Sequence, residues 1–220
     1  MKISSVKVFK LSGNSKLLGY SSVCLDERII VKKIKIAEGK YGKFIGMPST
    51  SVKKDGKTSY KDLCFFNKKG VDLRKELSDK VLNIYENDTN DENNKEITSE
   101  PLQFSNIYLR KIPSESKMKA VASVTVNDVL VINDLRLIEG SKGLFLSFPS
   151  VPYTKDGKTE YETLIYFLDK EDTDNLTNLI IDVISIQIKK HIESYEFVAF
   201  FICIDITSIM WYSKYKKEWN

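Results

Sequence analysis

The chain has 220 residues, 42% hydrophobic and 29% charged, enough for one or two domains with a real core and unlike a disordered or fibrous protein. A single histidine, His191, and three scattered cysteines without a C-x-x-C pair argue against zinc sites, a disulfide framework and histidine chemistry, and suit the reducing cytoplasm. The net charge of +4 divides unevenly, into +10 over 1–86, −4 over 87–101, −3 over 102–185 and +1 over 186–220.

Apolar residues in the first half recur with a period of two, which predicts strands with one buried face. Residues 6–8 read V-K-V and residues 34–36 read I-K-I. A hairpin turn is expected at 26–27, and the element E-G-x-x-G at 38–42 supplies a second turn in which glycine offers a positive φ.

A helix is predicted after these strands. Asp72 is placed to cap it, and apolar side chains follow at spacings of four, four and three. These side chains are Leu73, Leu77, Val81 and Ile84.

The chain repeats itself. Residues 15–60 align with 116–161 without a gap, at a constant offset of 101, with 16 identities in 46 positions. The second copy keeps the alternating pattern and the turn signals, and ends in a predicted helix near 172–185. Looking for such repeats comes before any assignment of fold, and two copies of this length indicate two homologous domains.

We therefore expect an α+β protein of two domains, each with about four or five antiparallel strands followed by a helix. The expected boundaries are 1–86 for a basic domain and 102–185 for an acidic one. The polar, acidic segment 87–101 between them is typical of a flexible linker, and 186–220 forms an apolar tail.

Several motifs resemble the SpoVG family (stage V sporulation protein G, septation regulator). The second copy carries the family's core in KMKAVASVTVNDVLVINDLRLIEGSKGLFLSFPS at 117–150. In the first copy, MKISSVKVFK is similar to the family's opening, Tyr60-Lys61-Asp62-Leu63 to its [FY]-[RK]-D-I, and Arg74 to the usual arginine of its helix.

This resemblance implies a small, cytoplasmic, bacterial, non-enzymatic protein, commonly dimeric, that binds nucleic acid and modulates gene expression or septation. Two copies in one chain would then pack as an intrachain pseudo-dimer. The loop after Pro-Ser is longer here than the family's, and the family's histidine is Phe65. Glu162 stands where the first copy has Lys61, so the second copy is expected to be mainly a structural partner.

Cationic residues of the first copy are the candidate nucleic-acid contacts, because clustered lysines neutralise phosphates and release counterions. Tyr60 is a candidate for stacking on a base, although a plain strand residue is the simpler interpretation. Lysine-rich surfaces also merely solvate a fold, and composition alone favours that reading. The candidate residues are Lys40, Lys43, Lys53, Lys54, Lys57, Tyr60, Lys61, Arg74 and Lys75.

No catalytic, metal or cofactor site is predicted. The G-K-T at 56–58 and 157–159 lacks the earlier glycine of a phosphate loop, so a tight hairpin turn is the better interpretation. Cys24 has no basic neighbour in sequence and is expected to be a small core residue.

The tail contains FVAFFICIDITSIMWY at 197–212, shorter than a spanning helix and broken by Asp205. It is interpreted as core or an oligomer surface, with membrane association as the less favoured alternative. The opening ten residues lack the apolar run of a secretory signal, so a cytoplasmic location is expected. The function expected is a regulatory DNA- or RNA-binding protein; the alternative is a protein-interaction, septation or membrane-associated module that uses the tail.

Overall fold

A computed structural model describes residues 1–220 except 14, 89–99, 114 and 187–220, and also leaves the side chain of Lys54 undescribed. The expected linker therefore lies almost wholly, and the apolar tail wholly, outside the described residues. The chain divides into two compact units, Met1–Thr177 and Asn178–Asn220. Both copies of the repeat, up to the first turns of the second helix, belong to the first unit.

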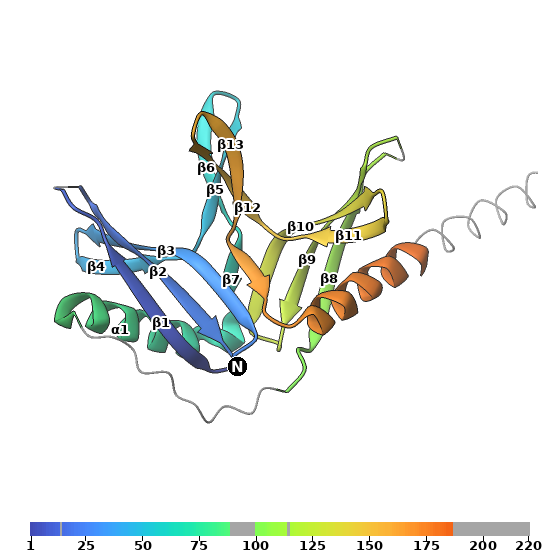
Figure 1. Cartoon of the computed structure of the whole chain (residues 1–220). Helices are drawn as coiled ribbons and strands as arrows, with labels where there is room; N and C mark the ends of the chain where they lie inside the picture. The colour runs from blue at the N-terminus through green and yellow to red at the C-terminus, as the bar shows by residue number, and fades with distance from the viewer. Residues whose placement is uncertain (14, 89–99, 114, 187–220) are drawn as a thin grey trace, which may run out of the picture. The chain divides into compact units, whose positions relative to one another are not determined.

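The first copy forms seven strands and then a helix (Figure 1). Its strands are β1 (Ile3–Lys10), β2 (Leu17–Leu25), β3 (Ile29–Gly39), β4 (Gly42–Gly46), β5 (Ser49–Lys54), β6 (Lys57–Asp62) and β7 (Cys64–Phe66). A 3-10 turn (Lys68–Gly70) leads into α1 (Val71–Asn87).

The second copy follows the same order. Its strands are β8 (Phe104–Lys111), β9 (Met118–Val126), β10 (Leu130–Gly140), β11 (Gly143–Ser147), β12 (Ser150–Lys155), β13 (Lys158–Thr163) and β14 (Ile165–Phe167). A helix follows at 170–186. The predicted α+β class, with an antiparallel sheet and a C-terminal helix in each copy, is confirmed.

The sheets differ from the expectation in one respect, the position of the last short strand. Strand β7 of the first copy pairs with β10 of the second, and β14 of the second pairs with β3 of the first. Each five-stranded sheet thus has four strands from one copy and one from the other, in the orders β1-β2-β3-β14 with β4 on β3, and β11-β10-β9-β8 with β7 on β10. The two hairpins β5–β6 and β12–β13 are separate two-stranded ribbons.

The exchange is reciprocal down to single hydrogen bonds. The Lys32 amide donates to the Leu164 carbonyl at 2.7 Å, and the Asn133 amide donates to the Leu63 carbonyl at 2.8 Å. Because both pairs are related by the offset of 101, the two copies give strands to each other in the same way.

The predicted turns are confirmed by their backbone angles. Asp26 and Glu27 both have positive φ, of 50° and 53°, which matches the primed two-residue turn that suits the twist of a hairpin. The turn at Asp55-Gly56 has the same character, with φ of 50° and 73°, so the G-K-T at 56–58 begins in a tight hairpin turn and continues onto β6, as expected, and does not form a phosphate loop.

In the first copy the core lies between the sheet and α1. Leu77 and Val81 of α1 are fully buried, as their spacing predicted, together with alternate residues of the sheet such as Val31. The expectation for Asp72 was wrong: α1 begins at Val71, and no side chain caps it. Instead, the Asn67 side chain accepts the Lys69 amide and caps the 3-10 turn that comes first.

Candidate nucleic-acid interface

The β5–β6 hairpin carries five of the candidate residues and is the most cationic exposed element of the first copy. Every residue of β6 is exposed. In the register of the ribbon, Lys53 lies opposite Thr58, Ser51 opposite Tyr60, and Thr50 opposite Lys61. In the part of the chain that the structure describes, no residue forms an ion pair with Lys53, Lys57 or Lys61.

The same register separates the hairpin residues onto two faces. Side chains alternate along a strand, so Lys57 and Lys61 share one face while Tyr60 lies on the other, with Lys53. Tyr60 is 72% exposed, and the Lys35 ammonium of β3 lies 5.7 Å from its ring centroid. The tyrosine is therefore an accessible ring flanked by cations, as a stacking residue requires.

Lys40 and Lys43 lie at and just after the turn between β3 and β4, and they differ in whether a carboxylate binds them. Lys40 lies 5.2 Å from the centroid of the exposed Tyr41 ring. The Lys43 ammonium is 2.9 Å from a carboxylate oxygen of Glu86 on α1, and this hydrogen bond raises the pKa of Lys43. Lys40 is therefore the more available of the two for an outside anion.

Arg74 has a structural position. Its guanidinium donates to the Ile45 carbonyl at 2.7 Å and so joins α1 to β4. Half-burial lowers the pKa of Arg74 through desolvation, against an opposing contribution from Asp62. Its neighbour Lys75 is exposed, so of these two helix residues only Lys75 lies where a phosphate can reach it readily.

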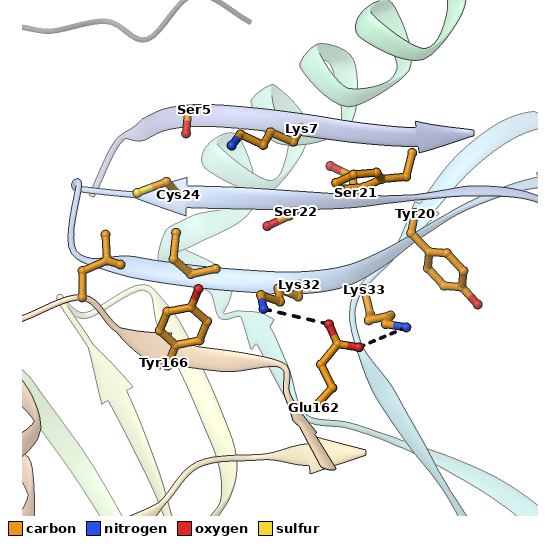
Figure 2. A pocket seen from close by; sticks show the side chains of 13 residues that line it. Ser5, Lys7, Tyr20, Ser21, Ser22, Cys24, Lys32, Lys33, Glu162 and Tyr166 are labelled. Atoms are coloured by element: carbon orange, nitrogen blue, oxygen red, sulfur yellow. Dashed lines mark ion pairs between the residues drawn. The ribbon is translucent and has the colours of Figure 1, made fainter. Parts of the chain in front are cut away.

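A groove of about 680 Å³ crosses the sheet formed by β1, β2, β3 and β14 (Figure 2). Its lining includes Lys7, Tyr20, Lys32 and Lys33 of the first copy and Glu162, Tyr166 and Leu168 of the second. The groove residues alternate along their strands with buried ones, such as Lys7 with Val6, and therefore lie on the face opposite the core.

Charges in the groove are paired across the two copies. The Lys33 and Lys32 ammonium groups lie 3.2 Å and 3.9 Å from the Glu162 carboxylate, as the dashed lines in Figure 2 show. Lys32 is also 5.3 Å from the Tyr166 ring centroid, and Lys33 is 5.4 Å from that of Tyr20. Two cations thus converge on one carboxylate, and each of the two also lies near an aromatic ring.

The sequence analysis did not identify the two tyrosines of the groove, Tyr20 and Tyr166. Tyr20 has a readable signal, since it alternates with buried residues along β2. Tyr166 has none, because its place in the groove depends on the pairing of β14 with β3.

The second hairpin has a different charge. On β13, Glu160 and Glu162 occupy the positions of Ser59 and Lys61 on β6. The Tyr153 hydroxyl donates to Glu160, and this hydrogen bond raises the pKa of Tyr153. The basic character is therefore confined to the hairpin of the first copy.

Neither described cysteine is activated. Burial, followed by the charge of Glu27, raises the pKa of Cys24, and burial raises that of Cys64 further, so both thiols are protonated near neutral pH. Among the described residues, no group of three His, Cys, Asp or Glu side chains is placed to hold a metal ion. None of the helices in the described part of the chain is long and apolar enough to cross a membrane.

Comparison with known proteins gives a consistent result. The SpoVG family model matches residues 1–87 and 102–185. One relative, from Agathobacter rectalis, is 37% identical over 81 residues, which is 37% of this chain and 90% of the relative. Others from Lachnospira eligens and Clostridium perfringens are 33% and 35% identical over the same length, covering 37% of this chain and 89% and 87% of their own. The names of all three contain the words "septation protein SpoVG".

Proposed function

Since this chain belongs to the SpoVG family and carries two copies of the family's domain, we propose that it is a non-catalytic regulatory protein that binds DNA or RNA. The basic first copy contacts the phosphates, and the second copy serves as its partner in an intrachain pseudo-dimer. The thiols of the two described cysteines, Cys24 and Cys64, are unpaired and protonated, which suits action in the cytoplasm.

One observation carries the proposal: Lys53, Lys57 and Lys61 of the β5–β6 hairpin are exposed and have no ion-pair partner among the described residues. Exposed surface ion pairs contribute little to stability, so a fold gains little from lysines, paired or unpaired, on a hairpin. A phosphate backbone, in contrast, gives each such cation a partner and releases a counterion for each contact.

The strand exchange supports the pseudo-dimer. Each copy completes the sheet of the other, through β7 on β10 and β14 on β3. One chain therefore supplies both halves of the pseudo-dimer, so the two halves can differ in sequence. The two hairpins do differ, since β5–β6 is basic and β12–β13 is acidic.

A second function is favoured by the names of the relatives, which refer to septation. In this alternative the chain is a protein-interaction module without nucleic-acid binding, and the apolar segment 197–212 is its contact surface. Absence of any nucleic-acid affinity, together with self-association that is lost when apolar residues of 197–212 are made polar, would favour it.

The test is anisotropy with labelled duplex DNA, single-stranded DNA and RNA, using the full chain across about 50 to 200 mM salt. The variant K54E/K57E changes the pair that faces each other beside the first hairpin turn. We expect weaker binding and a log–log salt slope smaller by about 2, since each phosphate contact contributes about 0.9.

The chain offers a matched control. The variant K155E/K158E makes the same change at the equivalent positions of the second hairpin, where the two residues are also paired. It should change the salt slope by less than half as much. Equal effects of the two variants, or no effect of either in folded protein, would contradict the assignment of the first hairpin.

A further inference from the structure

We propose that the groove on β1, β2, β3 and β14 binds single-stranded nucleic acid, with a base on its tyrosine rings and a phosphate on its lysines. This inference rests on the proposed function and makes it more specific, since it names the strand state that the protein prefers. The hairpin lysines then supply general phosphate attraction, and the groove distinguishes an open strand from a duplex.

The groove has the size and lining of a ligand site. Its volume of about 680 Å³ lies within the range of small-molecule sites, and its floor is a sheet, which positions side chains rigidly. Phe9 at the edge of this face is 58% exposed, so an apolar ring is available next to Tyr20. Rings on an open sheet face suit stacking of bases, which tolerates any sequence because each base has a π-face.

The lysines of the groove are placed so that they could bind a phosphate. The Lys32 and Lys33 ammonium groups converge on one carboxylate, that of Glu162, and Lys7 lines the same groove. Three cations and a single anion line the groove, so it keeps a net positive charge and attracts a further anion. We infer that Glu162 occupies the position a phosphate takes, and that it moves aside when the strand binds.

A duplex does not meet these requirements. Its bases are paired and stacked inside the helix and offer no free face to Tyr20 or Tyr166. The hairpin lysines need only a phosphate backbone, which both strand states provide. Preference for single strands should therefore reside in the groove alone.

The second copy lacks the tyrosine and the two lysines of the groove at the equivalent positions of its own sheet. Val121 stands for Tyr20, Asn133 for Lys32 and Asp134 for Lys33. Asp134 is bound by Arg136 at 2.6 Å. Lys33 and Asp134 share a positive φ, of 58° and 59°, so the backbone is the same and only the side chains differ.

This correspondence supplies substitutions that the fold already accepts. The variants are Y20V and K32N/K33D, which bring the residues of the second copy to the first, and E162Q, which removes the competing carboxylate. The control is R110D/K111N, which makes the same change of net charge on exposed residues of β8.

Binding is measured by anisotropy with the full chain, using a single-stranded oligonucleotide of about 12 nucleotides and a duplex of the same length. We expect Y20V to weaken single-strand binding about tenfold, as loss of a stacked base would, and K32N/K33D to weaken it about tenfold through loss of phosphate contacts. Either variant should change duplex binding by less than about twofold. E162Q should strengthen single-strand binding about threefold. A variant that merely misfolds would not give this gain.

The outcomes separate the groove from the proposed function. Unchanged single-strand affinity in Y20V and K32N/K33D, with binding still lost in K54E/K57E, overturns the groove and leaves the hairpin. No binding by the wild-type chain overturns both. As a second measurement, photocrosslinking of a bromouridine oligonucleotide should label peptides containing Tyr20 or Tyr166, and labelling confined to 50–61 would overturn the groove.

Discussion

The ion pair between Arg28 and Asp172 joins the two copies, and its removal should destabilise the whole exchanged unit. The Arg28 guanidinium lies 2.8 Å from one Asp172 oxygen, and the other oxygen accepts the Leu102 amide at 3.2 Å. The hydrogen bond from Asp172 raises the pKa of Arg28. The side chain of Asp172 is 2% exposed and that of Arg28 is 16% exposed.

The magnitude for Asp172→Val follows from this burial. Removing one partner of a buried pair costs about 3–5 kcal/mol, because the other charge stays buried without compensation. Here Asp169 remains 3.3 Å from Arg28 and some solvent reaches it, which favours the lower end, about 3 kcal/mol. For a chain of this length that loss lowers Tm by about 6–12 °C.

The offset of 101 provides the compensating variant. At this offset, Val129 and Val71 are the sequence equivalents of Arg28 and Asp172, so valine replaces both charged residues in the counterpart positions. The double variant R28V/D172V removes both charges and should recover more than half of the loss.

Urea unfolding of the full chain measures these free energies, with Asp174→Val as the control on the same helix. The side chain of Asp174 is 59% exposed, and its carboxylate is as far as 4.0 Å from the Lys170 ammonium, so its removal should cost less than about 0.5 kcal/mol. A loss below about 1 kcal/mol for Asp172→Val, or a double variant less stable than the single one, would refute the reasoning.

Three further predictions concern stability and binding. Arg74→Ala should cost about 1–3 kcal/mol in urea unfolding, because the buried Ile45 carbonyl loses its donor, while the nucleic-acid salt slope of the folded variant stays within error. Leu77→Ala should cost about 2–5 kcal/mol, measured the same way, since Leu77 is fully buried in the core. Hydrogen bonds from Lys69 and then Ser105 lower the pKa of Asp128; its stabilisation is present above the unfolded value of 3.8 and lost as pH falls through the folded pKa. Asp128→Asn should therefore lower Tm at pH 7, and the difference should vanish in acid; a difference that persists there would contradict this assignment.

The strand exchange explains why the two copies have diverged. In a symmetric dimer, both chains have the same residue at each position, so a glutamate introduced to face Lys32 and Lys33 would appear in both halves. In a single chain the second copy places Glu162 against the lysines of the first, while its own sheet carries Asn133 and Asp134. Tandem duplication therefore permits one specialised groove.

The sequence alone was sufficient for most features set by local physics, although not for the start of α1, where the expected Asp72 cap was wrong. The repeat is visible as identity at a constant offset, and the strands follow from alternation, which reflects burial of one face. The turn at Asp26-Glu27 and the buried side of α1 follow from residue chemistry and spacing. The exposed hairpin lysines were likewise found from the loop composition.

Only the tertiary structure decided which strand pairs with which. A three-residue strand such as β14 offers the same backbone donors and acceptors to any edge, so its pairing with β3 is selected by burial of Ile165 and Phe167 and not by a local signal. The groove depends on that choice, because it brings Tyr166 and Glu162 to the lysines of the first copy. Arg74 likewise resembled a phosphate contact in sequence, and its place against the Ile45 carbonyl arises from the packing of α1 on β4.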